Sequence, residues 1–341
     1  MRRIKLVDTR KFEIEEVSTP RHGEKEALVR IKKVGICGSD LHIYRGENPV
    51  IKAPVVLGHE AVGIVEKTGP KVVSFREGQR VVIIPYVSCG RCEYCRSNHP
   101  NVCDNLLTIG GMTENGAFAE YMVLPEDFLI NIPEGITLEE AVLIEPTTVA
   151  VRAIKRSRNV QGKNIAILGA GTIGLLILQV ARIYGAKRIL ITDIVEEKLK
   201  LAKRLGADIT LDVSRRDYFK ILRKDDGLRK FDVVFDCVVN RESIKLSFSL
   251  VKKAHKVVVV GIPTKEVEVN FIPIICGELD LSGSYLYLRE DFLEARKLIK
   301  DKSINTSSLI SKQFPFTEVA RAFQEIEENK GKLVKVILNM A

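Results

Sequence analysis

The sequence predicts an α/β protein with two parts, a strand-rich domain and a doubly wound, parallel-sheet domain. In the first 150 residues, short apolar and β-branched runs alternate with glycine and proline, as in strands joined by turns. From Asn164 to about Gly283, strand-like runs alternate with helical periods, and units of that length predict a parallel sheet covered on both faces. At 341 residues the chain is long enough for two domains, each with its own core.

We place the strand-rich domain at residues 1–150. Each of its expected strands is rich in apolar or β-branched residues and lies next to a turn signal. The runs that carry this prediction are residues 27–37, 61–69, 79–87 and 119–125.

We place the alternating domain at residues 151–285. Its expected strands are 164–169, 188–193, 232–238 and 256–262, and its expected helices are 172–185, 196–206 and 243–253. The tail then holds two amphipathic helices, 290–302 and 316–330, and a closing strand, 332–338.

The bulk composition favours an ordinary globular enzyme. The formal net charge is +9, but Lys and Glu are interleaved along helical stretches, which is typical of a solvated, ion-paired face. The longest apolar runs are far shorter than the roughly 20 residues of a membrane span, and the charged start does not match a signal peptide. We therefore expect a cytoplasmic enzyme with neither a nucleic-acid nor a membrane partner.

Four cysteines fall within fifteen residues, in the spacing C-x2-C-x2-C-x7-C. Four thiolates bind zinc as a tetrahedron with Zn–S distances of about 2.3 Å, and such a closed site leaves no position for a substrate. Two disulfides or four unrelated thiols are the alternative, but nothing in the sequence marks the chain as secreted. The spacing predicts a structural zinc site at Cys89, Cys92, Cys95 and Cys103.

Residues 169–174 match G-x-G-x-x-G, follow an apolar strand and open a helix, as in dinucleotide-binding folds. The three glycines allow a tight turn, approach of the backbone to a pyrophosphate, and close helix–strand packing. Asp193 would accept hydrogen bonds from the ribose hydroxyls and repel a 2′-phosphate, which favours NAD over NADP. Lys198 would lie along the adenine, with an ordinary surface lysine as the equal alternative. The expected cofactor-binding residues are Gly169, Gly171, Thr172, Ile173, Gly174, Asp193, Lys198, Gly261 and Ile262.

Two further clusters hold zinc-ligand chemistry. Residues 35–42, GICGSDLH, supply a thiolate, a hydroxyl and an imidazole, and residues 58–60, GHE, supply an imidazole and a carboxylate. A lone Cys–His pairing is more often packing plus a polar contact. These clusters lie upstream of a closed zinc site and a dinucleotide fingerprint, which favours a catalytic metal site.

The order GICGSDLH, GHE, the four-cysteine segment, IEPTTVA and GAGTIG resembles the zinc-dependent medium-chain alcohol dehydrogenase family along essentially the whole chain. Within it, the chain is most similar to the branch of polyol, threonine and butanediol dehydrogenases. Glu145 supports that placement, because simple alcohol dehydrogenases usually carry a cysteine ligand there. The resemblance implies a GroES-like catalytic domain, 1–150 completed by 286–341, and a Rossmann NAD-binding domain, 151–285.

The resemblance also implies a ligand set for the catalytic zinc. Cys37 and His59 would bind the metal, and Glu60 would be a third ligand. Glu145 would coordinate the metal or hold its bound water, with a carboxylate that caps the following helix as the alternative. Three or four ligands of mixed type leave an open position for a substrate.

The implied mechanism is hydride transfer assisted by a Lewis acid. Zinc would lower the pKa of the substrate hydroxyl, and hydride would pass to the nicotinamide ring. Ser39 would carry the released proton, through the nicotinamide ribose, to His42. The alternative for His42 is an ordinary surface histidine.

The resemblance implies two zinc ions per chain, NAD, and a homotetramer or homodimer. The expected substrate is a secondary alcohol of a polyol, sugar acid or related small sugar derivative, oxidised to the ketone. Leu286 stands where polyol members commonly have an arginine, and Thr147-Thr148 where threonine dehydrogenases usually have glycine and asparagine. The alternatives are an L-threonine 3-dehydrogenase or butanediol dehydrogenase, an inactive structural relative, and a zinc-ribbon nucleic-acid binder.

Overall fold

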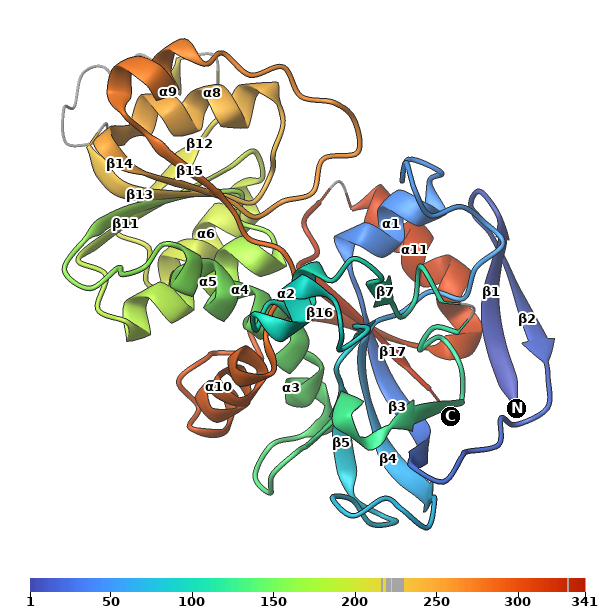
Figure 1. Ribbon diagram of the computed structural model, residues 1–341. Helices are drawn as coiled ribbons and strands as arrows, with labels where there is room; N and C mark the ends of the chain where they lie inside the picture. The colour runs from blue at the N-terminus through green and yellow to red at the C-terminus, as the bar shows by residue number, and fades with distance from the viewer. Residues whose placement is uncertain (114, 216, 219–221, 223–229, 330, 341) are drawn as a thin grey trace. The chain divides into compact units, whose positions relative to one another are not determined.

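The computed structural model describes residues 1–113, 115–215, 217–218, 222, 230–329 and 331–340, in two compact units (Figure 1). The first unit comprises Met1–Glu145, Leu288–Lys302 and Thr306–Ala341, and the second comprises Pro146–Tyr287 and Ser303–Asn305. Helix α4, Ile144–Arg156, starts in the first unit and continues into the second. Among the described residues, no helix has both the length and the apolar character that crossing a bilayer requires.

The first unit is built on a seven-stranded sheet. Its strand order is β16-β17-β3-β4-β5-β9, and β8 pairs with β3. All pairs are antiparallel except β16 with β17. Because β17 pairs with β3, the C-terminal segment lies beside a strand from the start of the chain. The strands are β3 (Glu26–Ile36), β4 (Glu60–Thr68), β5 (Arg80–Ile83), β8 (Tyr121–Pro125), β9 (Leu129–Asn131), β16 (Ile310–Pro315) and β17 (Lys335–Asn339).

Smaller elements surround this sheet. Two two-stranded sheets pair β1 (Arg2–Asp8) with β2 (Lys11–Glu16) and β6 (Tyr86–Val87) with β7 (Leu107–Thr108). The helices are α1 (Gly38–Tyr44), α2 (Glu93–Arg96), α3 (Leu138–Val142), α10 (Arg289–Lys300) and α11 (Val319–Glu328), with 3-10 turns at Pro100–Val102, Glu126–Phe128 and Phe316–Glu318.

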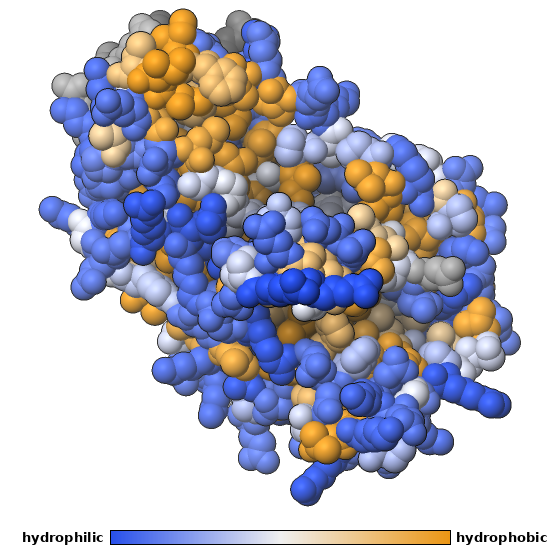
Figure 2. Space-filling view, viewed as in Figure 1, coloured by the Kyte–Doolittle hydropathy of each residue, from blue (hydrophilic) through white to orange (hydrophobic). Residues whose placement is uncertain are grey.

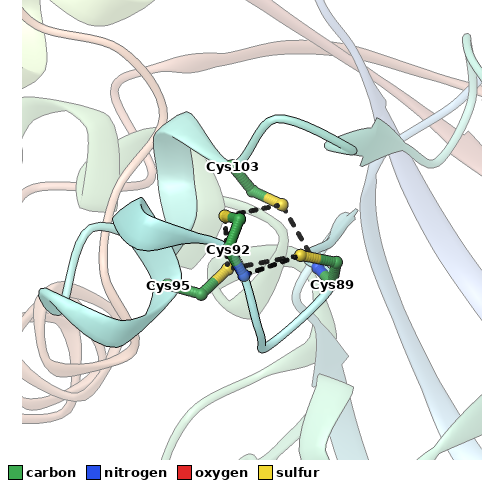
Figure 3. A group of neighbouring side chains, drawn as sticks. All are labelled: Cys89, Cys92, Cys95 and Cys103. Carbon is green, nitrogen blue, oxygen red and sulfur yellow. Dashed lines mark hydrogen bonds between the residues drawn. The ribbon is translucent and has the colours of Figure 1, made fainter.

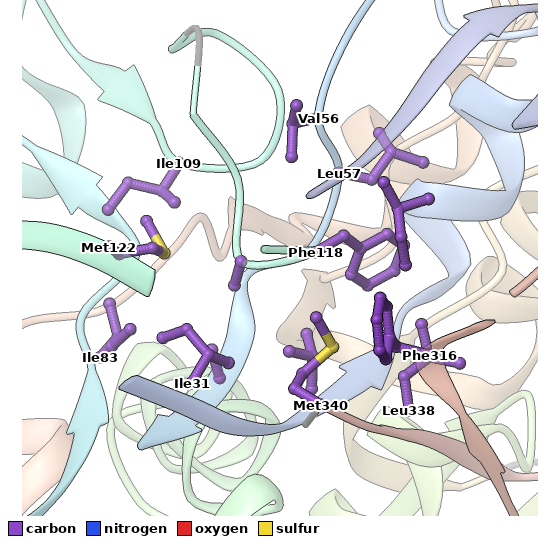
Figure 4. Packing of buried hydrophobic residues seen from close by; sticks show 14 of the residues in the cluster. Ile31, Val56, Leu57, Ile83, Ile109, Phe118, Met122, Phe316, Leu338 and Met340 are labelled. Carbon is purple, nitrogen blue, oxygen red and sulfur yellow. The ribbon is translucent and has the colours of Figure 1, made fainter. Parts of the chain in front are cut away.

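One apolar core joins the two ends of the chain in this unit. Helix α11 buries Val319, Ala322 and Phe323, a spacing that keeps all three on one helix face. They pack with residues of β3 and β17, and Figure 4 shows Phe118 and Leu338 among the gathered side chains. The C-terminal segment is therefore part of the core.

The second unit is a doubly wound fold, which confirms the predicted α/β class. Its six strands are parallel in the order β12-β11-β10-β13-β14-β15, the order of dinucleotide-binding sheets. The strands are β10 (Asn164–Leu168), β11 (Arg188–Asp193), β12 (Ile209–Asp212), β13 (Phe231–Asp236), β14 (Val251–Val259) and β15 (Asp280–Gly283). Its other helices are α5 (Thr172–Ile183), α6 (Glu196–Arg204), α8 (Arg241–Leu250) and α9 (Ile272–Gly277).

Several expected elements were wrong in extent, and two of them have a clear physical reason. The helix expected over 243–253 ends at Leu250, and the following residues open β14, because Val251 already has an extended backbone. The run 79–87 forms two short strands, separated at residues 84–85. Pro85 has no N–H to donate, which prevents continuous pairing there.

Candidate functional site

The antiparallel pair β3–β4 brings together the thiolate and imidazole that the sequence singled out. Cys37 follows β3 and His59 precedes β4, so both lie at the same end of the pair, where Gly35 is opposite Glu60. One ligating atom from each of Cys37, His59 and Glu60 lies within 4.8 Å of the other two. A Cβ at Gly35 would lie 2.0 Å from Glu60 Oε2, so the missing side chain makes room for this carboxylate.

Asp40 contacts both Cys37 and His59, and it was not among the site residues predicted from the sequence. Its side chain is fully buried, Oδ2 accepts a hydrogen bond from Cys37 N at 2.9 Å, and Oδ1 lies 3.6 Å from His59 Nδ1. Burial lowers the pKa of His59, but the negative charges of Asp40 and Cys37 outweigh it, and the pKa rises well above its usual value. The field that favours a proton on His59 equally favours a metal cation.

Glu60 is held by a lysine that the sequence reasoning also missed. Lys335 Nζ lies 2.6 Å from Glu60 Oε1 and 2.5 Å from Oε2, and it donates to the carbonyl of Ile36 at 3.2 Å. Burial lowers the pKa of Lys335, but Glu60, Cys37 and Glu145 together raise it above its ordinary value. The lysine therefore stays charged and balances part of the negative charge of the group.

Glu145 lies outside the tight group. Among the described residues, the set whose ligating atoms all lie within 4.8 Å of one another contains Cys37, His59 and Glu60 and not Glu145. Glu145 is only 5% exposed and stands in the first turn of α4, where the helix dipole stabilises a carboxylate. Its charge nevertheless acts on Lys335.

Ser39 and His42 both lie on α1, three residues apart and so on one helix face. Ser39 is exposed, and His42 Nδ1 lies 2.9 Å from Glu47 Oε2. Tyr44, at the end of the same helix, is buried and stacks on Phe12 with ring centroids 5.4 Å apart. It is a packing residue of the core.

The four cysteines of the expected structural site converge, as Figure 3 shows. Their sulfur atoms lie 3.5–4.0 Å apart in the pairs Cys92–Cys95, Cys92–Cys103 and Cys89–Cys95. A tetrahedron with Zn–S bonds of 2.3 Å has S–S edges of about 3.8 Å, whereas a disulfide needs about 2.05 Å. All four thiols are free, so the disulfide alternative is excluded and the cage fits zinc.

Backbone amides prepare this cage for thiolates. Cys103 Sγ accepts from Cys89 N at 3.2 Å and from Asn105 N at 3.3 Å. Hydrogen bonds from the backbone, first that of Arg91, lower the pKa of Cys89 to about 6, while burial raises the pKa of Cys95 to about 11. A cation at the centre would favour the thiolate form of all four.

In the second unit, the glycine motif joins β10 to α5. Gly169 has a φ of +94°, which favours glycine, and a Cβ at Gly174 would lie 1.8 Å from the carbonyl oxygen of Gly169. A Cβ at Gly171 would meet nothing within 4 Å, so open space lies before the start of α5. Thr172 and Ile173 form the first turn of α5, whose amides favour a phosphate.

Asp193 organises this loop. Its Oδ2 accepts from Ala170 N at 2.7 Å, and its Oδ1 accepts from Ile194 N at 2.8 Å and Val195 N at 2.9 Å. Oδ2, with a single donor among the described residues, has further acceptor capacity for a ribose hydroxyl. Lys198 is half-buried. Burial lowers the pKa of Lys198 by more than the negative charge of Asp193 raises it.

A turn after β13 borders the same loop and was not anticipated. The buried Asp236 carboxylate accepts from the amides of Val238 and Val239, both at 2.9 Å. A Cβ at Gly169 would meet Val238 Cγ2 at 2.8 Å, and Gly261 N donates to Asp236 O at 3.1 Å. Gly261 is thus tied to this turn, while Ile262 is exposed.

Comparisons with known proteins find similar chains along nearly the whole length of this one. The alcohol dehydrogenase GroES-like domain matches residues 23–134, and the zinc-binding dehydrogenase domain matches residues 172–301. The chain is 31% identical to sorbitol dehydrogenase of Bacillus subtilis over 97% of this chain and 95% of that protein. It is 32% identical to L-idonate 5-dehydrogenase of Vitis vinifera over 98% of this chain and 93% of that protein. An alcohol dehydrogenase structure from Escherichia coli, in complex with NADH, has a TM-score of 0.92 and 33% identity over 99% of each chain.

Proposed function

The chain belongs to the zinc-dependent medium-chain alcohol and polyol dehydrogenase family, and we propose that it oxidises a secondary alcohol of a polyol, sugar acid or related small sugar derivative to the ketone, with NAD as hydride acceptor. The observation that carries this proposal is the meeting of Cys37, His59 and Glu60. Sulfur, nitrogen and oxygen donors of this kind suit zinc, and a set of three leaves a position for the substrate oxygen.

In this proposal, Cys37, His59 and Glu60 hold the catalytic zinc, with Glu145 as a nearby carboxylate for bound water. Bound zinc supplies Lewis-acid polarisation of the substrate hydroxyl, and NAD supplies the hydride acceptor. The Asp40 carboxylate, 3.6 Å from His59 Nδ1, favours the tautomer with its proton on that nitrogen, as a carboxylate behind a ligating histidine commonly does.

The released proton leaves through α1. Ser39 takes the proton of the substrate hydroxyl as it gives up its own hydroxyl proton, and His42 receives the proton released in this relay and passes it to water. Glu47 accepts from His42 Nδ1, which leaves Nε2 as the proton acceptor.

A panel of polyols, aldonates, 2,3-butanediol and L-threonine, followed by NADH absorbance, tests the reaction. We expect turnover with a polyol or sugar acid and about two zincs per chain by metal analysis. Ser39→Ala should cut kcat while both zincs remain, and Ser18→Ala, at an exposed loop serine, is the control. Turnover confined to L-threonine or to butanediol would replace this substrate class with one of the two family alternatives, and no turnover on any member would refute it.

We extend the proposal to cofactor choice, compartment and assembly. The Asp193 carboxylate supports NAD, and a reducing compartment such as the cytoplasm would keep four zinc-site thiols reduced. The edge strand β15 and α9 expose Phe271, Ile275 and Leu281 at 62%, 71% and 45%, and Figure 2 shows hydrophobic surface over that region. Such an exposed apolar face supports a homodimer or homotetramer joined through this unit. Light scattering measures the molar mass in solution, and Ile275→Lys should lower it if this face is the interface.

A further inference from the structure

The first unit contains a cavity of about 600 Å³ that shares no residue with the metal or dinucleotide sites. It is lined by side chains of β1 and by segments 50–56 and 111–113. A volume of this size is typical of sites for small organic molecules. The proposed dehydrogenase chemistry leaves this cavity without a role.

The charge of the lining is positive. Arg3, Lys5 and Lys52 contribute three cations, and no acidic side chain occurs among the described lining residues. Arg3 Nε and Lys5 Nζ share one carboxylate, that of Glu15, at 2.9 and 3.4 Å. Among the described residues, Lys52 Nζ contacts the carbonyl of Gly46, at 3.5 Å. Two cations therefore share one anion, and the third has no carboxylate partner in the part of the chain that the structure describes.

The neighbouring acid on β2 does not restore the balance. Glu13 is opposite Lys5 in the strand register, but its carboxylate pairs with Lys11 at 3.1 Å. The side chains of Arg3 and Lys5 are only 25% and 29% exposed, so solvent screens them less than it screens a fully exposed lysine. An anion in the cavity would meet a net positive field.

The other half of the lining is apolar and partly uncovered. Val50 is 70% exposed and Met112 is 46% exposed, both beside the cations. The side chain of Ile51 lies close to Gly111, where a Cβ would be only 2.6 Å from Ile51 Cδ1. The absence of a side chain at Gly111 therefore leaves room for Ile51 in this apolar wall. A bare inorganic ion would leave the apolar side chains in water, and a neutral apolar molecule would bury the cations without a partner.

We propose that this pocket binds a small amphiphilic anion, an organic phosphate or carboxylate whose apolar body covers Val50 and Met112 while its charged group meets Lys52, Arg3 and Lys5. The binding step involves no covalent chemistry. It goes beyond the proposed dehydrogenase function and does not depend on it.

The test uses the full-length, zinc-loaded protein with saturating NAD, so that the dinucleotide site is blocked. The probe is 8-anilinonaphthalene-1-sulfonate, which joins an aromatic body to an anion, followed by its fluorescence. We expect one site per chain, an affinity about fivefold weaker in Lys52→Gln, and a larger loss in Lys5→Gln/Lys52→Gln, since each exposed charge contributes modestly. The control Lys11→Gln removes the same charge from the next strand and should stay within about twofold.

Displacement then identifies the chemical class. Phenyl phosphate or benzoate should displace the probe at lower concentration than inorganic phosphate, and Val50→Ser should reduce that difference. Equal losses in Lys52→Gln and Lys11→Gln would overturn the site, and so would a probe that does not bind when NAD saturates the dinucleotide site. Equal displacement by inorganic phosphate would overturn the role of the apolar wall. NAD affinity and alcohol oxidation should be unchanged in these variants, so failure here is distinguishable from failure of the dehydrogenase proposal.

Discussion

In protein without the catalytic zinc, which Glu60 would otherwise help to bind, replacing Lys335 with Met should strongly destabilise the first unit, because it leaves the Glu60 carboxylate buried without its partner. The two side chains are 2% and 1% exposed, and Nζ lies within 2.6 Å of both carboxylate oxygens. Removing one member of a buried ion pair costs about 3–5 kcal/mol. For a unit of this size that corresponds to a fall in Tm of roughly 6–20 °C. Differential scanning calorimetry at neutral pH measures the shift.

Two companion variants show whether the buried pair is the cause. Glu60→Met/Lys335→Met removes both charges and should recover much of the lost stability, since apolar replacement of a buried pair is often neutral. Lys312→Met breaks a partly exposed ion pair between Lys312, on β16 of the same sheet, and Glu325, on α11. It should lower the free energy of unfolding by only about 0–1 kcal/mol. A Lys335→Met protein as stable as Lys312→Met, or a double variant no better than the single one, would refute the reasoning.

Three other changes test the structural zinc, the cofactor preference and one ion pair. Cys103→Ser should lower the zinc content from about two to about one per chain and make segment 88–104 sensitive to protease. Asp193→Asn removes the charge that would repel a 2′-phosphate, so the kcat/KM ratio of NADP to NAD should rise about tenfold, or about 1.4 kcal/mol. Burial raises the pKa of Asp232, but Lys252 and the amide of Asn164 outweigh it, so the pKa lies below its usual value. This carboxylate stabilises the fold above about pH 4, and the contribution is lost as pH falls through the lowered pKa, so Asp232→Asn should flatten the acid limb of stability against pH.

Two of these changes have a matched control. Cys276→Ser alters an exposed cysteine outside the cage and should keep both zincs. Asp301→Asn alters an exposed aspartate and should leave the acid limb unchanged. Unchanged zinc content in Cys103→Ser, an unmoved cofactor ratio in Asp193→Asn, or identical acid limbs for Asp232→Asn and the parent protein would each contradict the corresponding prediction.

Local patterns were enough to predict most of the fold. The period-two and helical runs of the second unit, and the glycine motif between β10 and α5, depend on neighbours in sequence, so a linear reading finds them. The predicted boundaries of helices and strands were wrong where the local sequence pattern conflicts with strand pairing in the sheet. Residues 251–253 continue an apparently helical run, yet they belong to β14, whose first residue, Val251, pairs with Phe231 of β13.

The candidate sites divide in the same way. The four-cysteine cage is a local spacing, so the sequence predicted it fully. Lys335 left no signal, because it lies 275 residues after Glu60 and is one of many lysines in the chain. Asp40 left a partial signal, since it stands in the same motif as Cys37 and caps α1.

By itself the sequence determined the chemistry that is available: a thiolate, an imidazole and a carboxylate for one metal, four thiolates for another, and a phosphate-binding glycine turn. Only the tertiary structure decided how that chemistry is balanced. The pairing of β17 with β3 brings a buried cation to Glu60, and the burial of Asp40 gives His59 its anionic neighbour. In a buried site, the interaction between two charges depends on the distance between them in space. The number of residues between them in the sequence does not determine that distance.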